Sequence, residues 1–215
     1  AFLLVLMLCL VSASALADAP VLTFSHTSGF YDDTVHLEIT CDTKKVTIHY
    51  TLDGSLPDEN SPVYEGLLTL TDSSERADVL MRIGGTNSAE EYIPTMDFPT
   101  ARVVRAVAIT NRGEKSAVAS GTYFVGYDRK ELYGDTAIVC LVTEKDNLFG
   151  YEEGIYVLGK IYDQWAPQQD GPFEDWEAQG NFTQHGKEWE RPVSVTLLAS
   201  DGTSFTQDMG MRIKG

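Results

Sequence analysis

Hydrophobic and polar residues alternate with period two along the first half of the chain. Segments 34–40 and 45–51 show the alternation most clearly, and their apolar positions are Val35, Leu37, Ile39, Val46, Ile48 and Tyr50. Such alternation is typical of strands that bury one face. Asp53-Gly54 and Asn111-Arg-Gly113 supply turn residues between segments. Further strands are expected over 66–70, 79–83, 102–110 and 121–125.

The spacing of these segments predicts the fold class of the first half. About seven short strands over about 105 residues are typical of an immunoglobulin-like β-sandwich. We therefore expect a mainly β chain whose first domain spans 18–126. A long loop over 86–100 interrupts the strands, and we assign no chemistry to it.

The second half has a different pattern. A linker or short helix over 127–134 precedes a continuous apolar run over 136–143, which predicts a strand covered on both faces. Segment 191–199 alternates again, with Val193, Val195 and Leu197 as its apolar positions. We expect an incomplete β-rich unit over 135–215, with further strands over 154–158 and 209–213 and a loop over 163–182.

The chain begins with an apolar segment, and no charged residue precedes Asp18. The run over 1–11 is too short for a membrane-spanning helix, which needs about 20 residues. Ala15-Leu-Ala17 has the small-residue pattern of a cleavage site. We expect a signal peptide over 1–17, truncated at its start, rather than a buried helix, and hence an exported chain without a membrane span after cleavage.

Composition restricts the classes of partner. With 32 acidic and 16 basic residues the formal net charge is -16. Nucleic acid and anionic lipid are therefore not expected as partners. Export permits a disulfide between Cys41 and Cys140, but two cysteines are no disulfide framework, and we favour two small buried thiols.

Four histidines are candidate metal ligands: His26, His36, His49 and His185. His36 and His49 occupy outward positions of neighbouring predicted strands and could meet across a hairpin. Two ligands without a third make a weak site. We assign no metal site, and interpret the histidines as solvated or turn-capping residues.

An acidic cluster surrounds one tryptophan in the second half. Its members are Asp170, Glu174, Asp175 and Glu177, with Trp176 among them and Trp165 nearby. Paired carboxylates hydrolyse glycosides, and aromatic rings hold sugars. We favour a hydrated acidic loop, because the whole chain is acidic.

Other motifs carry little chemistry. Nucleophile-elbow, Walker A and dinucleotide-binding motifs are absent from the sequence. Gly84-Gly85 is interpreted as a turn rather than an anion site. Asn181-Phe-Thr183 is a glycosylation sequon. We assign no catalytic residue.

Four segments of the first half form a recognisable set. They are 24–31, 48–57, 61–66 and 104–108, and their core is Tyr50-Thr-Leu-Asp-Gly-Ser-Leu-Pro57 followed by Ser61-Pro-Val-Tyr64. Over 20–126 the chain resembles the small sandwich module named after the C-terminal domain of chitobiase and β-hexosaminidase. The resemblance implies a non-catalytic accessory module of secreted bacterial proteins, without ligand residues to carry over.

Five motifs follow in order in the second half: Asp146-Asn-Leu-Phe-Gly150, Gly154-Ile-Tyr-Val157, Gly180-Asn-Phe-Thr183, Gly186-Lys-Glu-Trp-Glu-Arg-Pro-Val193 and Gly210-Met-Arg-Ile213. They resemble the opening of a CotH-type kinase domain, an atypical kinase family first associated with spore coats. The resemblance implies phosphoryl transfer with ATP and magnesium in the complete protein, whose catalytic residues lie downstream of Gly215. Lys187 and Lys214 are interpreted as surface lysines.

The sequence thus predicts a fragment of an exported, CotH-family protein that is inactive by itself. Its sandwich module precedes the β-rich start of an atypical kinase-like α+β domain, and its partner is a protein substrate. The alternative is a non-catalytic protein that binds the cell surface or a polysaccharide, with Trp165, Trp176 and Trp189 as stacking platforms. A purely structural spacer is a third hypothesis.

Overall fold

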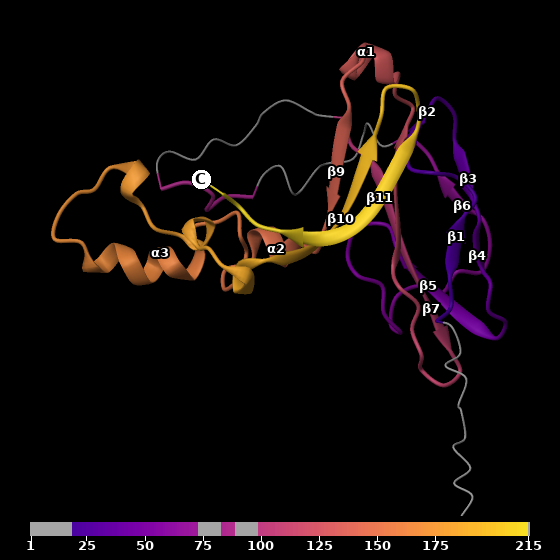
Figure 1. Ribbon diagram of the computed structural model, residues 1–215, viewed down its shortest axis with the longest axis horizontal. Helices are drawn as coiled ribbons and strands as arrows, with labels where there is room; N and C mark the ends of the chain where they lie inside the picture. Colours follow the sequence, from indigo (N-terminus) through magenta and orange to yellow (C-terminus); the bar gives the residue numbers. More distant parts are fainter. Residues whose placement is uncertain (1–18, 73–82, 89–98, 215) are drawn as a thin grey trace, which may run out of the picture.

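The computed structural model describes residues 19–72, 83–88 and 99–214, and these form two β-rich units (Figure 1). The predicted signal peptide over 1–17 lies outside the described residues. So do residues 79–82 of one predicted strand and residues 89–98 of the predicted long loop. Within the described part of the chain, no helix is long and apolar enough to cross a membrane.

The first unit is a β-sandwich, which confirms the mainly β fold class. One layer is a four-stranded sheet in the order β2 (Gly29–Tyr31), β8 (Ala119–Val125), β7 (Arg102–Thr110) and β5 (Val46–Thr51). Strand β2 runs parallel to β8, and the other neighbours are antiparallel. The opposite layer consists of two short antiparallel pairs, β1 (Leu22–Phe24) with β4 (Ile39–Cys41) and β3 (Val35–Leu37) with β6 (Leu68–Leu70).

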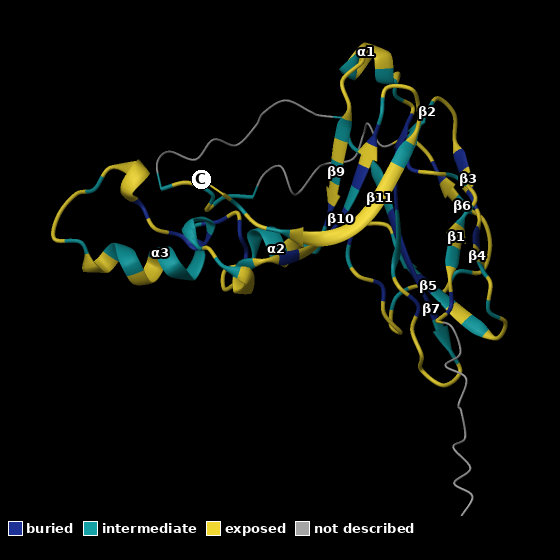
Figure 2. Cartoon of the chain, in the orientation of Figure 1, coloured by how far each residue is buried: buried dark blue, intermediate teal, exposed yellow. Residues whose placement is uncertain are grey.

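The core of the sandwich lies between these two layers (Figure 2). Its buried members are Val35, Leu37, Ile39, Leu70, Val104, Ala106, Tyr123 and Val125. Three of them are the alternating apolar positions of the predicted strand over 34–40. Period-two patterning therefore places side chains of strands far apart in the chain on one shared surface.

The predicted strand over 34–40 is divided in two at Glu38. The backbone of Glu38 accepts a hydrogen bond from Ser25 N at 2.9 Å and donates one to Ser25 Oγ at 2.9 Å. The chain therefore pairs with β6 before Glu38 and with β1 after it. The result is two short strands, β3 and β4, in place of one long strand.

The second unit contains a three-stranded antiparallel sheet in the order β11 (Ser204–Met211), β10 (Arg191–Leu198) and β9 (Ile138–Val142). A turn at Asp201-Gly202 joins β10 to β11. Asp201 Oδ1 accepts hydrogen bonds from Thr203 N at 2.9 Å and Thr203 Oγ1 at 2.7 Å. Gly202 has φ +85°, a conformation that favours glycine.

One short helix precedes β9, and short helices form much of the connection from β9 to β10. They are α1 (Arg129–Tyr133), which precedes β9, then α2 (Lys145–Phe149) and α3 (Gly159–Trp165), followed by four short 3₁₀ helices: η2 (Ala166–Gln168), η3 (Asp175–Glu177), η4 (Asn181–Thr183) and η5 (Lys187–Trp189). The strand predicted over 154–158 is wrong. Ile155 N and Tyr156 N donate instead to Asn147 O and Leu148 O, so this segment pairs with the last turn of α2.

The expectation that both faces of the 136–143 strand are covered is also wrong. Val139 and Leu141 of β9 are 57% and 52% exposed, whereas Val142 is buried. Leu197 lies opposite Val139 in the register of β10 and β9 and is itself exposed. A continuous apolar run shows that both faces are hydrophobic, but it cannot show that a second layer packs on each of them.

The two units contact each other through loops. Leu56 N, beyond β5, donates to Glu144 Oε1 at 2.9 Å. Segment 83–88 leaves the sandwich and lies beside the helical part of the second unit (Figure 1). There Gly85 O accepts from Leu158 N at 2.8 Å, and Ser88 Oγ donates to Asp175 Oδ1 at 3.1 Å.

Acid is expected to loosen the loop after β5, where Asp58 Oδ1 accepts hydrogen bonds from Asn60 N and Ser61 N. The backbone amide of Asn60 is the main cause that lowers the pKa of Asp58 below its usual 3.8. The carboxylate therefore stabilises the fold above about pH 4, and this contribution disappears as pH falls through the lowered pKa. Thermal melts of the wild type and Asp58→Ala should differ at about pH 6 and converge as the pH falls below the lowered pKa. Asp32→Ala removes an exposed carboxylate elsewhere and is the control; a difference for Asp58→Ala that persists unchanged in acid would contradict the prediction.

Candidate functional site: a polar cleft between the units

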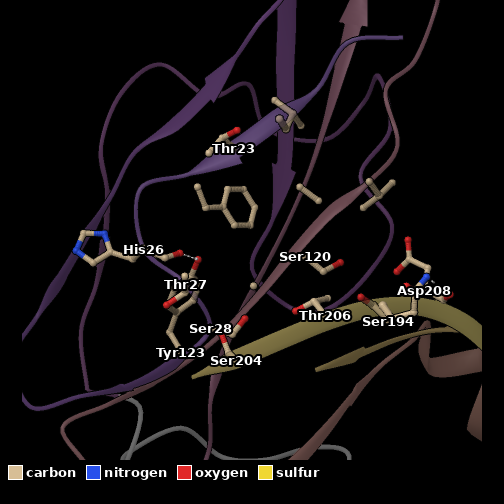
Figure 3. A pocket seen from close by; sticks show the side chains of 16 residues that line it. Thr23, His26, Thr27, Ser28, Ser120, Tyr123, Ser194, Ser204, Thr206 and Asp208 are labelled. Atoms are coloured by element: carbon tan, nitrogen blue, oxygen red, sulfur yellow. Dashed lines mark hydrogen bonds between the residues drawn. The ribbon is translucent and has the colours of Figure 1, made fainter. Parts of the chain in front are cut away.

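A cleft of 540 Å³ separates the sandwich from the sheet of the second unit (Figure 3). Strands β1 and β8 and the 26–28 segment form one wall, and strands β10 and β11 form the other. Hydroxyl side chains dominate the lining: Thr23, Thr27, Ser28, Ser120, Ser194, Ser204 and Thr206. The lining also includes the carboxylate of Asp208 and the apolar side chains of Leu22 and Phe24.

Some polar groups of the cleft already have partners. Ser28 Oγ accepts from Thr122 N at 3.0 Å, and the hydroxyls of Thr196 and Thr206 share a hydrogen bond of 2.9 Å. Tyr123 donates its hydroxyl to His26 O at 3.1 Å (Figure 3). Burial strongly raises the pKa of Tyr123, so its hydroxyl stays protonated and remains a donor. These bonds hold the walls in place.

Two hydroxyls of the cleft have no such partner. Ser194 is only 3% exposed, and neither its Oγ nor the buried Oγ of Ser120 makes a hydrogen bond within the described residues. A buried hydroxyl without a partner costs about 1–3 kcal/mol of free energy. Ser120 and Ser194 come from opposite walls, from β8 and β10, and both lie on the side of the cleft where Asp208 is found (Figure 3).

A smaller cavity of 290 Å³ adjoins this end and contains Arg105. It shares Ser194 and Asp208 with the cleft. Arg105 is 8% exposed. Its guanidinium donates through Nη1 to Gly54 O at 3.0 Å, whereas its Nε–H has no partner within the described residues. Burial lowers the pKa of Arg105, and the carboxylates of Glu144 and Asp208 oppose that effect, so the side chain stays cationic at neutral pH.

The histidines are not brought together. His36 lies on β3, which pairs with β6, and His49 lies on β5, which pairs with β7, so the expected hairpin between their strands is wrong. His49 is also buried rather than outward, because segment 61–64 runs along β5 and His49 Nδ1 bonds Ser61 O at 2.8 Å. Among the described residues, no group of three or more His, Cys, Asp or Glu side chains could hold a metal ion.

The acidic cluster serves local structure. The side chain of Glu177 accepts from Glu174 N at 2.9 Å and caps η3, and Asp175 bonds Ser88. Trp176 between them is 81% exposed. Trp165, in contrast, packs edge-on against Phe173, with 4.7 Å between ring centroids. The contacts of Glu177 and Asp175 therefore stabilise η3 and attach segment 83–88.

The burial of the remaining candidate residues, two cysteines, two lysines and the sequon asparagine, indicates what each is accessible to. Cys41 and Cys140 are free thiols, each partly buried. Lys187 and Lys214 are exposed. The sequon residue Asn181 is buried, so its side-chain amide is inaccessible to a glycosylating enzyme.

The motifs of the second half converge on one compact region around Asn181. Its Nδ2 donates to Tyr151 O at 3.0 Å, and its Oδ1 accepts from Ile161 N at 3.2 Å. Arg191, from the Gly-Lys-Glu-Trp-Glu-Arg-Pro motif, donates through Nε to Glu153 O at 2.8 Å and through Nη1 to Glu188 O at 2.8 Å. These side chains fix loop backbones, and both are buried.

Sequence reasoning missed the cleft because both faces of β10 contain buried residues. The alternation marks Val193, Val195 and Leu197 as the apolar face, but only Val193 is fully buried and Leu197 is 41% exposed. The alternate positions Ser194 and Thr196 are buried and face the sandwich side. The one available signal was Arg105, a charged residue inside the apolar strand Arg102–Thr110.

Comparison with known proteins gives one family match. Residues 37–123 match the family described as Fn3 associated. Neither the curated proteins nor the solved structures include a match to this chain. The matched residues include Arg105 and Ser120, so the β8 part of the cleft wall lies in a segment that is similar to the Fn3-associated family, whereas β1 and the 26–28 segment lie outside the match.

Proposed function

We propose that this chain is a non-catalytic part of an exported CotH-family protein. In this proposal the first unit is an accessory module of the chitobiase C-terminal type, and the second is the beginning of the kinase-like domain. The parent protein would transfer a phosphoryl group from ATP, with magnesium, to a protein substrate. The described residues would supply the scaffold for that reaction and none of its chemistry.

The observation that supports this proposal most is the use of the motif residues. Asn181 and Arg191 are buried, and their polar atoms form hydrogen bonds with backbone groups of neighbouring loops. Gly154 lies so close to the backbone of Gly150 that a Cβ would clash with it. Phosphoryl transfer needs carboxylates that hold metal ions and a cation on the phosphates. The residues that carry the CotH resemblance are engaged in packing instead.

The 215-residue chain is expected to show no ATP turnover. Purified chain would be incubated with magnesium and ATP, and ADP release compared with a blank that contains no protein. ADP formation that scales with protein and disappears with EDTA would contradict the proposal. In that case the double variant Lys187→Ala, Lys214→Ala would test whether the two exposed lysines contact the phosphates.

The exposure of Trp176 favours a second candidate, a protein that adheres to polysaccharide. The Trp176 ring is available for stacking, whereas Trp165 packs on Phe173. The guanidinium of Arg191 lies over the Trp189 ring, with 5.2 Å between Arg191 Cζ and the ring centroid. The three tryptophans therefore do not act as equal platforms. A fluorescence change with soluble glycans that Trp176→Ala abolishes would support this function; no change with any glycan would count against it.

A further inference from the structure

The face of β10 and β11 that lines the cleft is mostly polar. On the side of the cleft, β10 and β11 carry Ser194, Thr196, Ser204, Thr206 and Asp208. Leu198 is the apolar exception on that side. The opposite positions of the same strands are Val193, Val195, Leu197, Phe205, Gln207 and Met209, of which Gln207 is polar. Two layers that merely pack together bury apolar faces between them. Such a departure from the usual pattern is expected where a surface binds something.

The polar atoms where the cleft meets the smaller cavity form an incomplete hydrogen-bonding set. Ser194 Oγ, Ser120 Oγ and Arg105 Nε are buried and have no partner within the described residues. Ser120 lines the cleft, Arg105 lines the adjoining cavity, and Ser194 lines both. Arg105 and Ser120 are also cross-strand partners in β7 and β8. Buried polar groups are hydrogen-bonded in the large majority of cases, so three such groups in neighbouring positions indicate a partner from outside the chain. Each belongs to a different strand, so no single loop accounts for all three.

The types of donor and acceptor define the ligand. Serine and threonine hydroxyls both donate and accept, the Arg105 guanidinium only donates, and the Asp208 carboxylate only accepts. A polyhydroxylated molecule matches all three kinds of group, and the apolar Leu22 and Phe24 can contact its C–H groups. An anion is disfavoured, because Asp208 and Glu144 lie near the single cation. The volume of 540 Å³ lies within the usual range of about 300–1,000 Å³ for ligand sites.

We propose that the cleft between β8 and the β10–β11 hairpin, together with the adjoining cavity that contains Arg105, binds a short neutral saccharide. In this site the Ser194 and Ser120 hydroxyls and the Arg105 Nε–H bond sugar oxygens, and Asp208 accepts from a sugar hydroxyl. The site lies on different residues from Trp176, and it depends on neither the kinase-like assignment nor the adhesion candidate.

Calorimetric titration of the 215-residue chain tests the proposal. The probes are cellotriose, maltotriose, xylotriose and triacetylchitotriose, with trigalacturonic acid as an anionic probe. At least one neutral trisaccharide should bind saturably, and the anionic one should not. Ser194→Val and Asp208→Asn should each weaken the Kd at least ~10-fold, the effect of one strong hydrogen bond.

Matched variants distinguish lost binding from lost folding and from binding at Trp176. Ser194→Val removes a hydroxyl without a partner, so its melting temperature should not fall even though its affinity does. Asp32→Asn, at an exposed position, makes the same charge change as Asp208→Asn and should leave Kd unchanged. Absence of binding to all four neutral probes would overturn the proposal and leave ordered water as the partner of these groups. Binding that only Trp176→Ala removes would overturn it too.

Discussion

Replacing Arg191 with methionine is expected to lower the free energy of unfolding of the second unit by about 3–4 kcal/mol. Its guanidinium donates to the carbonyls of Glu153, Glu188 and Glu190 and lies over the ring of Trp189. Methionine keeps the apolar stem and removes every donor. The three carbonyls, held in a largely buried site, then lose charge-assisted hydrogen bonds that each contribute about 1.5–3 kcal/mol before relaxation.

Urea unfolding followed by tryptophan fluorescence measures this effect selectively, because Trp165, Trp176 and Trp189 all lie in the second unit. Arg212→Met is the matched control, because the Arg212 side chain is 51% exposed and its one ion pair is long, with 4.0 Å between Nε and Glu190 Oε2. The control should change stability by no more than about 0.5 kcal/mol. Equal urea midpoints for Arg191→Met and the wild type would show that the carbonyls find other partners.

Replacing Leu37 with alanine is expected to lower the free energy of unfolding of the sandwich by about 2–5 kcal/mol. Leu37 has no exposed surface and belongs to the core cluster between the layers. Both layers are tied by β-pairing, β3 to β6 and β7 to its neighbours, so they cannot close fully around the lost volume. The cost therefore includes both the lost burial and a residual cavity.

The sandwich contains no tryptophan, so hydrogen exchange measured by mass spectrometry is the suitable readout. Peptides that cover β3 and β7 should lose protection in Leu37→Ala, whereas peptides of the second unit should change little. Leu67→Ala, at a position 62% exposed, is the control and should leave exchange unchanged. Similar losses in both variants would mean that burial of Leu37 does not determine the stability of this unit.

The period-two pattern is sufficient to predict the sandwich, because Val35, Leu37 and Ile39 all reach one core. It cannot predict the partners of each strand. The turn at Cys41-Asp-Thr-Lys44 suggests a hairpin between its flanking strands, yet it carries the chain from one layer to the other. Pairing is decided by contacts with distant segments such as 61–64 and β7, which local spacing does not reveal.

The cleft was beyond sequence reasoning for a related reason. Alternation shows which residues share a face of β10, but not which face lies against another layer. Ser120 and Ser194 are 74 positions apart in sequence and approach only when the two units dock. Hydroxyl residues have no distinctive spacing, so nothing in the sequence sets Ser194 apart from the other serines.

The path of segment 83–88 has a consequence for how such modules are exchanged between proteins. This segment lies inside the Fn3-associated match over 37–123, yet Gly85 and Ser88 bond residues of the neighbouring unit. If the sandwich were joined to a different neighbouring domain, it would keep its core, but segment 83–88 would lose its hydrogen-bond partners Leu158 and Asp175. Recombination at domain borders would therefore preserve the strands while the loop is free to diverge with each new neighbour, so its length and composition should record which domain the module last adjoined.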